Sequence, residues 1–144
     1  MSSIQLFTPE QQQQIIQAIR SAELETSGEI RVHIEPHCPT PEVLDRAVQV
    51  FHQLEMDKTA QRSGVLFYLA TEDRKFAVLG DEGIDKAVPE NFWESTKEIM
   101  RDHFRNGRFT EGFCQGIERA GRQLRQYFPR LTDDTNELSD EISH

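Results

Sequence analysis

The sequence predicts an α/β protein, a three-layer αβα sandwich around a small mixed β-sheet. Helical and strand periodicities follow one another in the order helix, strand, helix, strand, strand, helices. One strand-like run is apolar on both faces, which is typical of a central strand covered by helices on each side. A chain of 144 residues is long enough to bury a core without disulfides or a structural metal. We therefore expect a single αβα domain over residues 1–128.

The first predicted helix covers residues 9–25. Thr8 is a suitable N-cap, Pro9 occupies the first helical position, and Gln11 follows three residues after the cap, as in a capping box. Apolar residues then recur at helical spacing, and Gly28 lies just beyond the predicted end.

Three strands are predicted, and their connections define the sheet. Residues 29–35 alternate between apolar and polar, so this strand is half-buried. Residues 64–70 form the central strand, which a helical connection makes parallel to the first. After a tight turn at 71–74, residues 75–80 return antiparallel to the second strand.

The remaining helices are expected from apolar spacing and from capping residues. Thr40 is a possible cap for a helix whose inward face is Leu44, Ala47, Val48 and Phe51. A short helix ends near Val88, Asn91 can cap the next helix, and Thr110 can cap the last. Residues 129–144 are acidic and poor in apolar side chains, which predicts a disordered tail.

Composition narrows the range of partners and compartments. The formal net charge is −9, so the average field repels a nucleic-acid backbone. Neither a signal peptide nor a run of apolar residues long enough to span a bilayer is recognisable. Cys38 and Cys114 are far apart and in no CxxC pattern, which favours a reducing compartment. We expect a cytoplasmic protein without a membrane or nucleic-acid partner.

The usual catalytic signatures, including the phosphate loop, the nucleophile elbow and the HExxH zinc motif, are absent from the sequence. His33, His37 and Cys38 lie close together in sequence and are residue types that zinc accepts. A polar strand face followed by a loop explains them equally well, and no fourth ligand is identifiable.

Five carboxylates are predicted to gather at one end of the sheet. Asp81, Glu82 and Asp85 follow the third strand, Asp57 precedes the second, and Glu29 opens the first. Because the third strand is antiparallel to the other two, these positions share one end. Crowded carboxylates are unfavourable unless a cation neutralises them or they are protonated, and oxygen ligands favour calcium, magnesium or manganese over softer metals. The alternative is that each is a helix cap or a solvated loop charge.

The order of several short segments resembles the TPM domain family, over about residues 6 to 128. The segments are Ser27-Gly28-Glu29-Ile30-Arg31-Val32, Gly64-Val65-Leu66, Asp73-Arg74-Lys75, and Gly80 with Gly83-Ile84-Asp85. The last is similar to the family's glycine-rich GxGLEG stretch, with Asp85 in place of its glutamate, and Asp81 stands where many relatives have an aromatic residue.

The resemblance implies an αβα sandwich and, as in several members, divalent cations bound in loops at the sheet edge. Some thylakoid relatives are described as acid phosphatases linked to photosystem II repair, and others act as receptor accessory proteins. Many members also have a signal peptide or a transmembrane helix, and we recognise neither pattern in these 144 residues.

Two functions follow from these expectations. In the first, a non-catalytic regulatory or interaction module binds calcium or magnesium at Asp57 and at Asp81 to Asp85, with Glu29 nearby, and then engages an unidentified protein partner. In the second, a metal-dependent phosphatase uses Arg31 or Arg74 to steady a phosphate while Asp81 or Asp85 ligates the metal. The absence of a recognisable nucleophile–base pair favours the module.

Overall fold

The computed structural model describes residues 7–130 and 138–144. The elements, in chain order, are α1 (Pro9–Glu23), β1 (Glu29–Glu35), α2 (Val43–Gln53), β2 (Gly64–Ala70), β3 (Lys75–Gly80), α3 (Glu82–Ala87), α4 (Glu94–Arg105) and α5 (Phe109–Leu124). This order confirms the predicted α/β class.

The sheet has the predicted mixed topology. Its strand order is β1-β2-β3, with β1 parallel and β3 antiparallel to the central β2. Glu29 pairs with Gly64, and Val65 pairs with Gly80. The start of β1, the start of β2 and the end of β3 therefore lie at the same end of the sheet.

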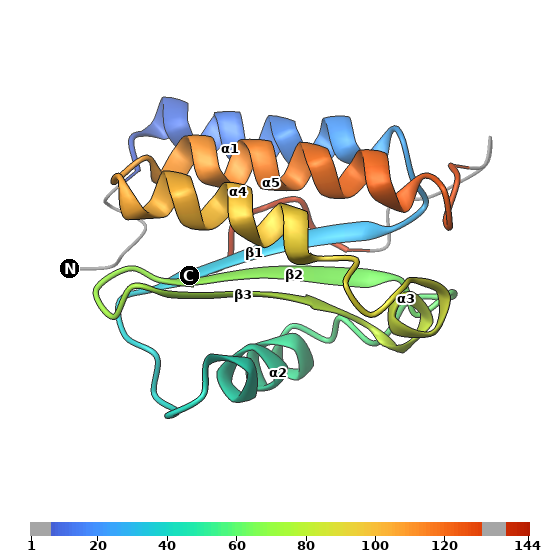
Figure 1. The fold of residues 1–144 in the computed structure, drawn as a ribbon, viewed down its shortest axis with the longest axis horizontal. Helices are drawn as coiled ribbons and strands as arrows, with labels where there is room; N and C mark the ends of the chain where they lie inside the picture. Colours follow the sequence, from blue (N-terminus) through green and yellow to red (C-terminus); the bar gives the residue numbers. More distant parts are fainter. Residues whose placement is uncertain (1–6, 131–137) are drawn as a thin grey trace.

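Helices cover both faces of the sheet and make three layers (Figure 1). Helices α1, α4 and α5 lie on one side, α2 lies on the other, and α3 sits at the end of the sheet where β3 finishes. The first face buries Ile30, Val32 and Phe67 against α1 and α5, while Leu66 and Tyr68 on the second face pack with α2. Central β2 is buried along its whole length because both faces are covered.

Helix α1 begins as predicted. The Thr8 hydroxyl accepts from the Gln11 backbone N–H at 3.1 Å, and the Gln11 side chain accepts from the Thr8 N–H at 2.9 Å. The two bonds complete the capping box and satisfy N–H groups that have no partner within the helix.

The predicted caps of three later helices are wrong. Helix α2 starts after Glu42, α4 after Trp93 and α5 after Arg108, none of which makes a side-chain capping bond. The Thr40 hydroxyl instead donates to the Glu42 carbonyl at 2.7 Å. Asn91 lies in a turn, where its carbonyl accepts from the Glu94 N–H at 3.1 Å. Packing of these segments, rather than a capping side chain, sets where they begin.

The predicted inward face of α2 is only half right. Ala47 and Phe51 are buried, but Leu44 and Val48 are 50% and 42% exposed. Helix α2 is the layer that covers the second face in Figure 1, so its outer side meets solvent.

Part of the predicted disordered tail is packed against the domain. Residues 131–137 of that tail lie outside the described residues, but 138–144 lie along the outer edge of β1. Ser143 donates its N–H to the Val32 carbonyl at 2.8 Å and accepts from the Ile34 N–H at 2.9 Å. Leu138 is 9% exposed, so even a mostly polar segment can be held by a few well-placed contacts.

No described helix has both the length and the apolar character needed to cross a membrane. Cys38 and Cys114 are both free thiols.

Candidate functional site

Two loops meet at the end of the sheet where α3 begins. The Asp81 N–H donates to the Gly64 carbonyl at 2.8 Å, and the Gly83 N–H donates to the Arg62 carbonyl at 2.9 Å. A Cβ added at Gly83 would lie 2.2 Å from the Gln61 carbonyl oxygen and 2.6 Å from that of Arg62. Only glycine allows this approach, so Gly83 holds the loop before β2 against the first turn of α3.

Asp81 binds the guanidinium of Arg62 through both carboxylate oxygens, with distances of 2.8 and 2.9 Å. One of these oxygens also accepts from the Glu82 N–H at 2.7 Å and so caps α3. The Asp81 side chain is 5% exposed, whereas that of Arg62 is 43% exposed. The carboxylate is thus fixed and buried, and its cationic partner reaches it from the solvent side.

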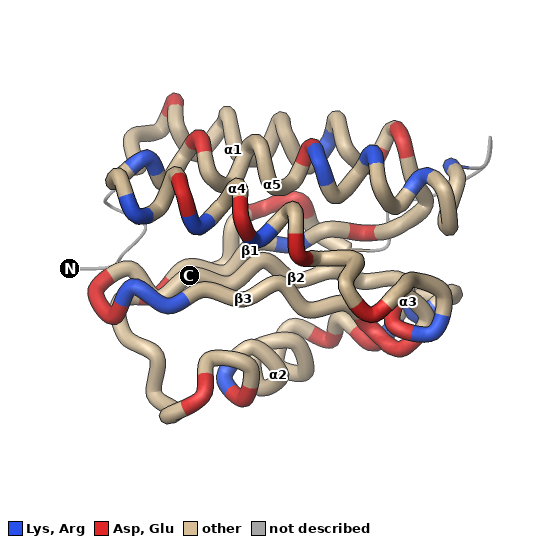
Figure 2. Tube along the Cα trace, viewed as in Figure 1, with Lys and Arg blue, Asp and Glu red and all other residues tan. Residues whose placement is uncertain are grey.

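The other acidic residues at this end surround the same pair. Glu82 lies 3.5 Å from Arg62 and 2.6 Å from Lys86. The hydrogen bond from Lys86 lowers the pKa of Glu82 most, and the positive charges of Lys86 and Arg62 lower it further. The hydrogen bond to Asp81 raises the pKa of Arg62, as do the charges of Asp81, Glu82 and Asp57. Burial, and then the charge of Asp81, raise the pKa of Asp85. Figure 2 shows the acidic positions gathered near α3.

Glu29 does not belong to this group. It is buried, and one carboxylate oxygen accepts from the Leu138 N–H at 2.9 Å. Although Glu29 lies at the predicted end of the sheet, its carboxylate contacts the C-terminal segment. The strand order therefore predicts the location of Glu29 correctly but not the direction of its side chain.

The residues at this end do not form a closed metal centre in the conformation described. Within residues 7–130 and 138–144, no three histidine, cysteine, aspartate or glutamate side chains are grouped to hold an ion. The position next to Asp81 that a cation would take is filled by the Arg62 guanidinium. A divalent ion would fit these carboxylates only if the Arg62 side chain moved away.

The predicted zinc ligands are also held apart. His37 is exposed and pairs with Glu72 at 2.9 Å and Asp73 at 3.1 Å. The Cys38 thiol donates to the Thr40 carbonyl at 3.4 Å. His33 points into a different group, described next, so these three residues do not share one centre.

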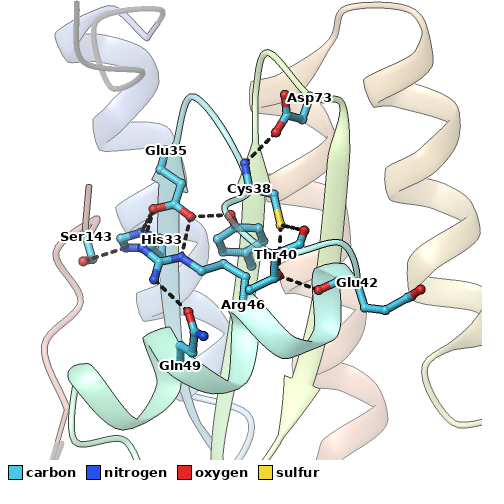
Figure 3. A network of polar contacts seen from close by, with 10 residues as sticks. His33, Glu35, Cys38, Thr40, Glu42, Arg46, Gln49, Asp73 and Ser143 are labelled. Carbon is cyan, nitrogen blue, oxygen red and sulfur yellow. Dashed lines mark hydrogen bonds and ion pairs between the residues drawn. The ribbon is translucent and has the colours of Figure 1, made fainter.

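A second polar cluster, centred on Glu35, was not predicted from the sequence (Figure 3). The Arg46 guanidinium donates to both Glu35 oxygens at 2.8 Å, His33 lies 3.2 Å from the same carboxylate, and the Tyr68 hydroxyl donates to it. Burial raises the pKa of Glu35, but the hydrogen bonds from Arg46, Tyr68 and His33 together outweigh it and lower the pKa to about 2. Glu35 is therefore an ionised carboxylate at neutral pH.

His33 links this cluster to the C-terminal segment. One ring nitrogen lies 2.9 Å from the Ser143 hydroxyl and the other 3.2 Å from Glu35. Burial lowers the pKa of His33, which keeps the ring neutral at pH 7. The order serine, histidine, carboxylate resembles that of a hydrolase triad, but the Ser143 N–H and carbonyl are both bonded to β1. We interpret the chain of contacts as a latch that holds residues 138–144 in place.

Only part of the Glu35 cluster has a signal in the sequence. The alternation of β1 places His33 and Glu35 on its polar face, and Arg46 is the one arginine or lysine within α2. Tyr68 stands in a run that is apolar on both faces, so nothing in that run marks its hydroxyl as a partner.

Comparison with known proteins agrees with this fold. The model of the TPM domain matches residues 2–123. The NMR structure of the BA42 protein from the psychrophilic bacterium Bizionia argentinensis is 46% identical, with a TM-score of 0.90 over 95% of this chain and 94% of that one. No curated protein matches the sequence.

More distant structures share the fold alone. The N-terminal domain of a P. gingivalis protein has a TM-score of 0.72 at 17% identity, over 90% of this chain and 85% of that one. The N-terminal domain of a Corynebacterium glutamicum protein has a TM-score of 0.59 at 10% identity, over 96% and 80%. The family match and the 46% identity together show that this chain belongs to the TPM domain family.

Proposed function

We propose that this protein is a non-catalytic module that binds Ca²⁺ or Mg²⁺ at the loops around α3 and engages a protein partner when the ion is bound. The observation that supports it is the environment of Arg62. Its guanidinium donates hydrogen bonds to Asp81 and lies 3.5 Å from Glu82, and the charge of Asp57 contributes to its raised pKa. Carboxylates from two separate loops therefore already surround one cationic group.

A divalent ion can compete with Arg62 for this position, because the arginine side chain is exposed and the carboxylates near it are suitable ligands. The Arg62 side chain is 43% exposed and sits on a residue with φ of 52°, a left-handed backbone that is unfavourable for arginine. Asp57, Asp81, Glu82 and Asp85 offer hard oxygen ligands of the kind that calcium and magnesium prefer. When Arg62 leaves, the ion takes over the neutralisation of Asp81.

The exchange supplies a switch because the two states differ in the loop that contains Arg62. An ion shifts a conformational equilibrium only by the difference in its affinity for the two states. The Gly83 N–H to Arg62 carbonyl bond joins this loop to α3, so movement of Arg62 reaches both segments. The released side chain and the reordered loop form the surface for the partner.

The geometry argues against Arg74 in the hydrolase alternative and leaves Arg31, on β1, as its candidate phosphate ligand. Arg74 precedes β3 and Asp81 follows it, so the two are separated by the full length of a six-residue strand, or about 20 Å. An arginine at that distance does not steady a phosphate bound to a metal at Asp81. We also propose a cytoplasmic location, which the wide sequence separation of Cys38 and Cys114 favours.

The test is a titration of chelator-treated protein with Ca²⁺ and then Mg²⁺, followed by calorimetry and amide NMR. We expect saturable binding with shifts at Asp57, Arg62 and 80–85. Arg62→Gln removes the competing cation and should bind roughly tenfold more tightly, whereas Asp81→Asn with Asp85→Asn should bind roughly tenfold more weakly. Asp45→Asn, a change at an exposed acid on α2, is the matched control.

The absence of saturable binding of either ion by the wild type and by Arg62→Gln would refute the proposal. If the Asp81→Asn/Asp85→Asn variant binds the ion as tightly as the wild type, the ion binds at a different site. Phosphatase assays with the bound ion test the hydrolase alternative in the same samples.

A further inference from the structure

A pocket lies at the opposite end of the sheet from α3, between the β2–β3 turn, the C-terminal half of α4 and the start of α5. Its volume is about 220 Å³, and its lining residues are Leu69, Arg74, Phe76, Arg101, Phe104, Arg105 and Phe109. An apolar cavity of about 150 Å³ accepts benzene, so this volume suits one substituted aromatic ring.

The floor of the pocket is aromatic. The Phe76 and Phe104 rings pack edge to face with centroids 5.2 Å apart, and the Phe104 and Phe109 rings lie 5.6 Å apart. All three side chains are half-buried, so each leaves part of its ring accessible in the pocket. A further ring packs favourably against such edges and faces.

The rim of the pocket is cationic. Arg74, Arg101 and Arg105 are exposed, and within the described residues none of them makes an ion pair. The neighbouring carboxylates have other partners, since Asp73 pairs with His37 and Asp102 lies 4.0 Å from Arg108. Three arginines gathered around one pocket are notable in a chain whose net charge is −9.

Each of these arginines stands in a position that is unfavourable for the fold. Arg101 and Arg105 are four residues apart on α4, where like charges repel and destabilise a helix. Arg74 has φ of 55°, in the left-handed region that glycine occupies at no steric cost. A bound anion would offset the repulsion between Arg101 and Arg105. At position 74 an arginine side chain can bind that anion, which a glycine could not do.

We propose that this pocket binds a small aromatic anion, namely a single ring with a phosphate or phosphonate group. The ring packs among Phe76, Phe104 and Phe109, and the guanidinium groups bind the oxygens, since arginine pairs with phosphate through two parallel hydrogen bonds. The Arg101 guanidinium carbon lies 5.9 Å from the centre of the Phe76 ring, which places charge next to the aromatic floor. Among the described residues that line the pocket there is no carboxylate, imidazole, hydroxyl or thiol, so we expect the pocket to bind its ligand without transforming it.

The test is an amide NMR titration of the full chain with phenylphosphonate in buffer that contains a chelator. The chelator separates this site from the proposed cation site, so that either proposal can fail alone. We expect saturable shifts at residues 74–76 and 101–109. Inorganic phosphate and benzyl alcohol, which each supply half of the ligand, should bind about tenfold more weakly. If either binds as tightly as phenylphosphonate, the aromatic anion is the wrong ligand class.

Substitutions locate the site. Arg101→Gln with Arg105→Gln should weaken phenylphosphonate binding about tenfold, because charged hydrogen bonds are lost. Arg122→Gln, at an exposed arginine on α5 outside the pocket, should leave the affinity unchanged. Equal affinities of the two variants would overturn the proposal. Phe76→Leu gives a second check, because it keeps an apolar residue but removes the ring, and it should also weaken binding.

A phosphotyrosine tripeptide in the same titration distinguishes two sources of this chemistry. Tighter binding than phenylphosphonate indicates a protein side chain as the ligand, and weaker binding indicates a free small molecule. Both results retain the aromatic phosphate, while the absence of binding by both compounds would refute it.

Discussion

Two arginine–carboxylate pairs, at opposite ends of the sheet, share the same geometry. Arg46 binds Glu35 with both distances at 2.8 Å, and Arg62 binds Asp81 at 2.8 and 2.9 Å. They differ in the exposure of the arginine, which is 17% for Arg46 and 43% for Arg62. They differ also in the other hydrogen-bond donors that contact the carboxylate.

Glu35 has further side-chain donors, Tyr68 and His33, so Arg46 is one member of a closed network. Asp81 has a backbone donor, the Glu82 N–H, and its arginine comes from a loop. Loss of Arg46 leaves Glu35 with its contacts to Tyr68 and His33. Loss of the more exposed Arg62 would uncover Asp81 to solvent or to another cation. Equal bond lengths therefore do not imply equal roles, because burial decides which arginine can be replaced.

The largest expected effect is on the Glu35 pair. Arg46→Met should reduce the free energy of unfolding by about 3 kcal/mol, because the half-buried Glu35 carboxylate loses two charged hydrogen bonds. Arg62→Met should lower it less, because the Arg62 side chain is 43% exposed and water can take its place beside Asp81. Urea denaturation of both variants at pH 7 measures the difference.

Acid tests the same contrast. The pKa of Glu35 is lowered to about 2, so its stabilising effect is present above the ordinary value of 4.5 and is lost as the pH falls toward 2. The deficit of Arg46→Met should shrink over that range. If the two variants lose similar stability, or the deficit is independent of pH, the comparison fails.

Gly83→Ala should have the next largest effect. The added Cβ collides with two backbone carbonyl oxygens, at 2.2 and 2.6 Å, and neither can rotate away. We expect a loss of about 1–3 kcal/mol in the free energy of unfolding and amide shifts in residues 61–63 and 81–85. Gly107→Ala is not a suitable control because its φ is positive, but Ala87→Gly measures the cost of a methyl group in α3. An unchanged stability for Gly83→Ala would show that the loop is not held by this contact.

A third carboxylate, Glu23, sharpens the comparison because burial acts on it most strongly. Burial, and then a hydrogen bond with Asp140, raise the pKa of Glu23 to about 9, despite the bond from the Ile30 N–H. The folded protein therefore holds this proton more tightly than the unfolded chain, and stability falls as the pH rises from 4.5 towards 9. Glu23→Gln should raise the free energy of unfolding by at least about 1 kcal/mol at pH 9 and change it little at pH 5. Thermal melts at both pH values measure this, and a gain that is equal at both would contradict the raised pKa.

The sequence pattern predicted elements whose periodicity is strong and local. Alternation in β1 and the apolar run of β2 gave both strands, and the capping box of Thr8 and Gln11 gave the start of α1. Thr40, Asn91 and Thr110 failed as caps because packing and turns, which depend on distant residues, decide where α2, α4 and α5 begin.

The candidate sites were harder to predict for the same reason. The strand order correctly brought Glu29 and Asp81 to one end of the sheet, but the directions of their side chains depend on Leu138 and Arg62. The pairing of Glu35 with Arg46 joins a strand to a helix eleven residues later through side chains alone. The arginine-rimmed pocket combines residues from β2, β3, α4, α5 and a turn, so no single segment has a pattern that marks it.

The contact between Ser143 and β1 also affects how the protein behaves in concentrated solution. A sheet whose outermost strand is uncovered offers a row of unused N–H and carbonyl groups, on which strands of other molecules assemble. Residues 138–144 occupy part of that row through the Val32 carbonyl and the Ile34 N–H. Detachment of this short segment would cost the domain few of its core contacts, yet it would expose a template for aggregation. We therefore expect the contact between His33 and Ser143 to matter for resistance to aggregation as well as for the fold.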